Sequence, residues 1–131
     1  MSISEGEGHP GRFEDWLRRE YAEGGAFTAL IVLLRIAGAR VDPLCSTYLN
    51  VIGDEVEWSD LVVLFAGAGQ TWDGAAFFPV RAREGGPLDN PAARVRLREI
   101  ETKIDADRLA LNAGHFFDAH GRRLRIDETS A

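Results

Sequence analysis

The chain has 131 residues, of which 45% are hydrophobic and 27% charged, and its formal net charge is −6. This length suits one domain with one core, and the composition is that of a globular protein and not of a disordered one. The acidic balance would repel a phosphate backbone, so nucleic-acid binding is not expected.

The sequence favours the cytoplasm. Cys45 is the only cysteine, which excludes an internal disulfide and a multi-cysteine zinc site. The first 13 residues lack the basic and apolar regions of a secretory signal. The longest apolar stretch, Ala26–Leu34, is far shorter than the ~20 residues of a membrane-spanning helix, so no membrane partner is expected.

We expect one globular domain over residues 12–127, between a flexible N-terminal tail at 1–11 and a loose C-terminal end at 128–131. The tail is rich in Gly, Ser and Glu and shows no hydrophobic periodicity. No internal repeat is visible in the domain.

Four helices are expected between about residues 12 and 66. The first and fourth show apolar side chains at helical spacing. They are Phe13, Trp16, Leu17 and Tyr21 in the first helix, and Trp58, Leu61, Val62 and Phe65 in the fourth.

The second and third helices depend on weaker signals. Nearly every residue from Ala26 to Ala37 is apolar, which allows a buried strand or a buried helix, and the length and the following Gly38 favour a helix. Asp42-Pro43 then has the residue types of a helix N-terminus. Several apolar side chains follow on one face of that helix: Leu44, Cys45, Tyr48, Leu49 and Ile52.

The second half of the chain predicts a strand, a long helix and a hairpin. An apolar, β-like segment spans about 75–82, and Pro79 in it indicates an edge strand or a bulge. Residues 91–112 show a helical stripe, and 115–127 have the turn and alternation of a β-hairpin that can pair with the strand. The predicted fold is therefore α+β and mostly helical.

The glycine-rich stretch from Gly67 to Gly74 raises the question of a phosphate-binding loop. Its glycines, Gly67, Gly69 and Gly74, do not have the G-x-G-x-x-G spacing, and the next segment is a predicted strand and not a helix. We interpret the stretch as a turn, and no cofactor is predicted. Trp72 in this turn can be a wedge under the loop or an exposed binding anchor.

Two histidines and two carboxylates form the candidate site. His115, Asp118 and His120 carry ligand atoms suited to zinc, although an extended strand would point His115 and Asp118 to opposite faces. A polar hairpin turn is the favoured interpretation, and no metal is predicted. The same histidines could act as general bases with Asp73 or Asp118 as the orienting carboxylate, but no nucleophile motif accompanies them.

Two hypotheses for the function follow. The first is a non-enzymatic cytoplasmic module that binds a protein partner or itself, since several amphipathic helices occur without a catalytic pattern. The alternative is a small enzyme or a ligand- or metal-binding domain with a pocket between the 67–74 loop and the 115–120 hairpin. Trp72, Asp73, His115, Asp118 and His120 would line that pocket.

Overall fold

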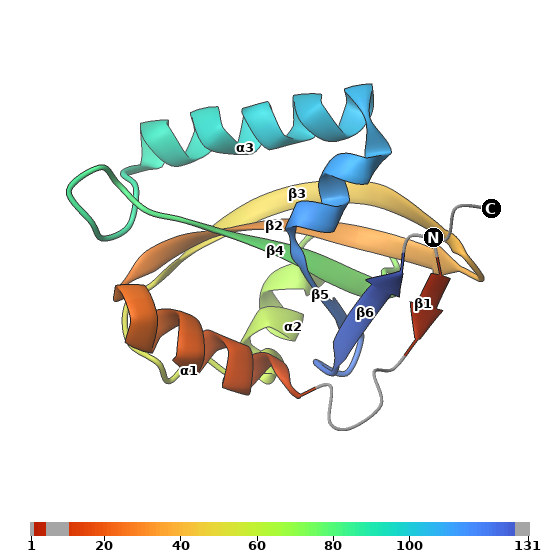
Figure 1. Cartoon of the computed structure of the whole chain (residues 1–131), viewed down its shortest axis with the longest axis horizontal. Coiled ribbons are helices and arrows are strands. Elements are labelled where there is room, and N and C mark those ends of the chain that lie inside the picture. Colours follow the sequence, from red (N-terminus) through yellow and green to blue (C-terminus); the bar gives the residue numbers. More distant parts are fainter. Residues whose placement is uncertain (1, 5–10, 128–131) are drawn as a thin grey trace.

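A computed structural model describes residues 2–4 and 11–127 of the chain. Its centre is an antiparallel sheet in the strand order β1-β6-β5-β4-β2-β3, with helices on both faces (Figure 1). The strands are β1 (Ser2–Ser4), β2 (Phe27–Ala37), β3 (Arg40–Val51), β4 (Gly74–Val80), β5 (His115–Asp118) and β6 (Arg123–Asp127). The helices are α1 (Phe13–Gly24), α2 (Trp58–Ala66), α3 (Asn90–Ala106) and the 3-10 helix η1 (Arg108–Ala113).

The fold is α+β, but the expected mostly helical architecture with four N-terminal helices is wrong. Helices α1 and α2 lie where the first and fourth helices were predicted. The segments between them are strands: β2 and β3 form a long antiparallel hairpin. The first half of the chain therefore contributes two strands of the sheet as well as two helices.

Strand β2 was misjudged because both of its faces are buried. Every residue from Phe27 to Leu34 is buried, and the side chains alternate between the two sides of the sheet. A strand covered on both faces has no polar face, so its sequence is a continuous apolar run, like that of a buried helix. The covering helices come from distant parts of the chain, which a local pattern does not reveal.

Strand β3 was misjudged because of Asp42-Pro43. Pro43 lies opposite Leu34 at a shift in the β2–β3 register, where Leu44 is the extra residue. A proline without an N–H is tolerated at such an irregularity in an edge strand, and β3 is at the edge of the sheet. The same dipeptide suits the first turn of a helix, and the sequence does not separate the two.

The second half of the chain forms the expected types of element, with two corrections. The long helix predicted over residues 91–112 ends at Ala106, and Arg108–Ala113 form the separate 3-10 helix η1. A strand, a long helix and a C-terminal hairpin are present, and β4 pairs with β5 of that hairpin. Strand β4 is not an edge strand, because it lies between β2 and β5. Pro79 is tolerated there because β5 pairs only with Gly74–Phe77, so Pro79 lies beyond the end of that ladder.

The ends of the expected domain are described only in part. Residues 1, 5–10 and 128–131, on which most of the two predicted flexible ends fall, lie outside the described residues. Ser2–Ser4, also in the predicted N-terminal tail, form β1 and pair with β6.

The sheet separates two hydrophobic cores. On one face α1 and α2 pack with the odd-numbered side chains of β2. On the other face α3 and η1 pack with the even-numbered ones. Phe13, Trp16, Trp58, Phe77 and Phe117 make the first core an aromatic cluster of tilted and edge-to-face rings. Among the described helices, none has the length and apolar character needed to cross a bilayer.

Candidate functional site

Trp72 is a wedge under the loop between α2 and β4. Its ring lies edge-on to Phe65, with 5.2 Å between ring centroids, and 6.1 Å from Trp58. The side chain is half-buried and packs against the aromatic core. Of the two roles open for Trp72, its contacts fit the wedge.

Asp73 attaches the same loop to the sheet. Its backbone N–H donates to the carbonyl of Leu34 at 2.8 Å, and its carboxylate accepts from the N–H of Ile36 at 2.8 Å. Upstream, Gly67 ends α2, and Gly69 has a positive φ of 69°. The glycine-rich stretch therefore turns the chain from α2 into β4, and no helix N-terminus follows it.

His115 lies half-buried at the start of β5. Its ring packs on Trp16, with 5.1 Å between centroids, and its Nδ1 is 2.8 Å from Nη2 of Arg123. Arg123 has only donors, so Nδ1 must be the acceptor and the ring must be neutral. Burial, reinforced by Arg123, lowers the pKa of His115 below its usual 6.5, whereas Glu20 acts weakly in the opposite direction.

Asp118 and His120 belong to the turn between β5 and β6. The carboxylate of Asp118 accepts from the N–H groups of His120 and Arg122 at 2.8 and 3.0 Å, and from Nε of Arg122 at 2.8 Å. Through these three hydrogen bonds the Asp118 carboxylate stabilises the turn. His120 is exposed, and its backbone carbonyl accepts from the Arg12 guanidinium at 3.3 Å.

Of the five candidate residues, only Asp118 and His120 share a hydrogen bond among those described, and Trp72, Asp73 and His115 have other partners. His115 pairs with Phe77 at one end of β5, and Asp118 pairs with Gly74 at the other. Asp73 bonds toward β2 and Asp118 bonds within its own turn. Within the described residues, no group of three or more His, Cys, Asp or Glu side chains is placed to hold a metal ion.

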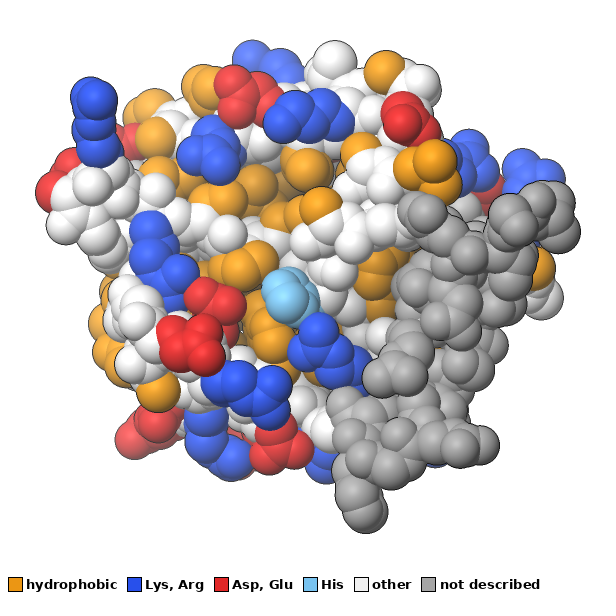
Figure 2. Space-filling view, in the orientation of Figure 1, with side chains coloured by type: hydrophobic (Ala, Val, Ile, Leu, Met, Phe, Trp, Pro, Cys, Tyr) orange, Lys and Arg blue, Asp and Glu red, His pale blue; other side chains and the backbone are white. Residues whose placement is uncertain are grey.

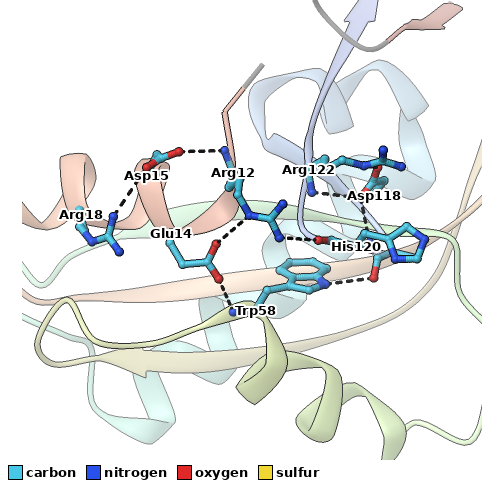
Figure 3. A network of polar contacts seen from close by, with 9 residues as sticks. Arg12, Glu14, Asp15, Arg18, Trp58, Asp118, His120 and Arg122 are labelled. Atoms are coloured by element: carbon cyan, nitrogen blue, oxygen red, sulfur yellow. Dashed lines mark hydrogen bonds and ion pairs between the residues drawn. The ribbon is translucent and has the colours of Figure 1, made fainter. Parts of the chain in front are cut away.

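A polar network around Trp58 connects α1, α2 and the hairpin turn (Figure 3). Glu14 of α1 accepts from the backbone N–H of Trp58 at 2.7 Å, which satisfies a free donor at the start of α2. The indole N–H of Trp58 donates to the carbonyl of Ala119 at 3.0 Å, and Arg12 contacts both Glu14 and His120. These bonds hold three elements together, so we assign the network a structural role.

A shallow hollow of about 200 Å³ lies between α3 and β4. Figure 2 shows apolar side chains between α3 and α1, with charged side chains around them. The floor of the hollow includes Phe78 and Ile100, and its one acid, Glu99, lies 3.5 Å from Arg96 in an ion pair. The charged residues of this lining, Arg96, Glu99 and Lys103, are exposed on α3.

The open edge of β3 is the most unusual surface of the fold. β3 is 12 residues long and pairs only with β2, so the N–H and C=O groups on its other side lack a strand partner in the described part of the chain. Residues 44–51, with the sequence LCSTYLNV, contain no charge and no proline. Edge strands are usually protected by charge, proline or cover against pairing with another chain. In β3 the protecting features are the charges of Arg40 and Asp42, the proline Pro43 and the register shift at Leu44, so they are confined to residues 40–44.

Apolar side chains of α2 flank this edge. A groove of about 390 Å³ runs between the middle of β3 and the C-terminal end of α2, and its lining includes Cys45, Thr47 and Leu64. Leu64 is 41% exposed and Val63 is 76% exposed. Burial raises the pKa of the Cys45 thiol, so Cys45 is a neutral apolar group in this groove.

No family model, curated protein or solved structure matches the chain. The β3 edge was not predicted, because residues 43–52 have apolar side chains at the spacing of a helix face. The available signal was the uncharged run from Leu44 to Val51 with β-branched and aromatic residues.

Proposed function

We propose that the protein is a non-enzymatic interaction module that associates with a second copy of itself through the edge of β3. The observation that carries this proposal is the open, uncharged edge of residues 44–51 beside the exposed apolar end of α2. A strand added at such an edge satisfies backbone groups, and side chains along the groove supply apolar contact. Each backbone hydrogen bond gained adds about 0.5–1.5 kcal/mol net.

Pairing between two identical copies suits this edge. When two β3 strands pair antiparallel about a two-fold axis, the sheets join and each face of one continues the same face of the other. The groove places Leu64 beside Cys45–Thr47, in the middle of β3. The Leu64 side chains of the two copies would then approach each other near the axis and lose solvent exposure.

The polar residues of the candidate site give less support to the alternative function, a small enzyme or a ligand- or metal-binding domain. Asp73 and Asp118 are occupied with backbone N–H groups, and His115 is neutral and bonded to Arg123. We place the module in the cytoplasm as part of the same proposal, because its one cysteine has no second cysteine in the chain to pair with.

Sedimentation velocity over a range of protein concentrations tests the proposal. The wild-type protein is expected to form a species of about twice its 14.4 kDa mass. Thr47→Lys and Leu64→Lys are each expected to shift the equilibrium toward monomer, because a lysine in this surface must be desolvated on pairing.

Val62→Lys is the matched control. Val62 is 39% exposed on α2, in a hollow with Arg12, Glu57 and His120, and it does not line the groove beside β3. It should associate like the wild-type protein, and circular dichroism should show all three variants folded. A wild-type protein that remains monomeric at the highest concentration, or folded edge variants that still associate fully, would overturn the proposal.

A further inference from the structure

The exposed side of α3 that lies next to the β3 edge carries a row of four charges. Residues 94, 98, 101 and 105 are spaced four, three and four apart, so they share one side of the helix, and all four are exposed. The Ser46 hydroxyl of β3 donates to the carboxylate of Glu101, which places this row above β3. The opposite side of α3, with Arg96 and Lys103, lines the hollow toward β4.

The row follows the edge along its length. Asn90 accepts from the Tyr48 hydroxyl at 3.2 Å, and Arg108, just after α3, pairs with Asp42. With the Glu101–Ser46 contact between them, these contacts show that α3 runs antiparallel to β3. The row of charges is therefore parallel to the surface that a second copy would occupy.

The charges in the row are ordered by sign. Arg94 and Arg98 form its N-terminal half, and Glu101 and Asp105 form its C-terminal half. The two ends of β3 also differ in charge. Arg40 is exposed at the start of the strand, and two exposed acids follow its end, Asp54 and Glu55.

We propose that these charges select an antiparallel, two-fold arrangement of two copies, in which Arg94 and Arg98 face Glu101 and Asp105 of the partner subunit. This inference rests on the proposed function and specifies its geometry. An antiparallel arrangement puts the basic half of one row opposite the acidic half of the other, and it also brings Arg40 toward the acidic end of the partner's β3. A parallel arrangement of the two β3 edges turns one sheet over, so the two α3 helices lie on opposite faces of the joined sheet and their charges do not meet.

The spacing of the elements permits these contacts. Paired strands are separated by about 4.8 Å, and α3 packs over both β2 and β3, so the two α3 axes would lie roughly 10–15 Å apart. Long side chains such as Arg and Glu can span that distance between neighbouring helices. Opposite charges across an interface mainly determine register and exclude wrong pairings.

Two charge-reversed variants test the inference. Arg94→Glu with Arg98→Glu makes the row entirely acidic, and Glu101→Arg with Asp105→Arg makes it entirely basic. Each variant alone is expected to self-associate about tenfold or more weakly than the wild-type protein, because attraction in the row becomes repulsion. An equimolar mixture of the two is expected to recover dimers, since each acidic row then faces a basic row.

The control keeps the charge change but moves it away from β3. Arg18→Glu with Arg83→Glu alters the net charge as much as the acidic variant does, and both residues are exposed, on α1 and on the loop after β4. This control should dimerise more strongly than the acidic variant. If the basic double variant does not fold, Asp105→Arg alone replaces it in the mixture.

The outcomes separate the inference from the proposed function. Wild-type dimers with reversed variants that associate equally well, or a mixture that does not recover dimers, would overturn the inference and leave the β3 interface standing. A wild-type protein that stays monomeric would overturn both. If each reversed variant forms weaker homodimers and the mixture recovers dimers, the antiparallel arrangement of the two charged rows is supported.

Discussion

At the scale of single residues, His115 makes the stability of the fold depend on pH. Its pKa is lowered in the folded protein, so protonation favours the unfolded chain. The contribution of neutral His115 to stability is therefore complete above its usual pKa of 6.5 and decreases as the pH falls below that value. The contact that protonation removes is the one between its Nδ1 and Arg123.

We predict that His115→Asn reduces the loss of stability between pH 7 and pH 5. The asparagine carboxamide oxygen can accept from Arg123 in place of Nδ1 and does not titrate in this range. Urea unfolding followed by tryptophan fluorescence at both pH values measures the difference. Equal losses of unfolding free energy in the variant and the wild-type protein would contradict the role assigned to His115.

At the scale of secondary-structure elements, Gly74 controls the approach of β4 to β5. A Cβ atom at Gly74 would lie 2.7 Å from the carbonyl oxygen of Phe117, a backbone atom that cannot move aside as a side chain can. We predict that Gly74→Ala lowers the free energy of unfolding by about 1–3 kcal/mol, the usual range for overpacking. Thermal or urea denaturation measures this change.

Gly67→Ala is the matched control for this prediction. Gly67 has a φ of −67°, and the nearest atom to an added Cβ would be the Leu64 carbonyl oxygen at 3.4 Å. The alanine should be accepted with little change in stability. If the Gly74→Ala protein is as stable as the Gly67→Ala protein, β4 and β5 can move apart at this point without a loss of unfolding free energy, and the prediction is wrong.

At the scale of the whole molecule, the two cores share their strands. β2 and β4 contribute side chains to both, whereas all three tryptophans lie on the α1–α2 side of the sheet. Leu111 is fully buried on the α3 side. We predict that Leu111→Ala destabilises the protein by about 2–5 kcal/mol and shifts the tryptophan fluorescence transition as much as the far-UV circular dichroism transition.

The matched comparison is Leu17→Ala, in the core on the side of the tryptophans. Both variants should show coincident transitions by the two probes if the sheet couples the cores. A fluorescence midpoint that stays at the wild-type value in Leu111→Ala, while the circular dichroism midpoint falls, would mean that the cores unfold separately.

The sequence by itself determined the elements whose signals are local. The helical stripe of Phe13, Trp16 and Leu17 predicts α1, and the alternation and turn of residues 115–127 predict the C-terminal hairpin. An amphipathic helix or a hairpin turn is specified by residues within a few positions of one another, so its pattern can be interpreted without the rest of the chain.

The candidate site depends on tertiary contacts that a local sequence pattern does not specify. Asp118 and His120 do lie in the hairpin turn that the sequence indicated, where the Asp118 carboxylate bonds to Arg122 and to the N–H of His120, whereas Asp73 bonds to backbone groups of β2. The open edge of β3 was not predicted, because it depends on which strand lies last in the sheet. Strand order is a property of long-range pairing, and the local pattern of residues 40–51 does not specify it.

Only the tertiary structure decided that residues 27–51 are strands. Phe27–Leu34 can form a buried helix or a strand covered on both faces, and the choice depends on α1, α2, α3 and η1 packing against it. Asp42-Pro43 likewise suits a helix start or an edge-strand bulge. Local preferences are small compared with the free energy of burying whole apolar faces, so the packing of distant elements determined the outcome.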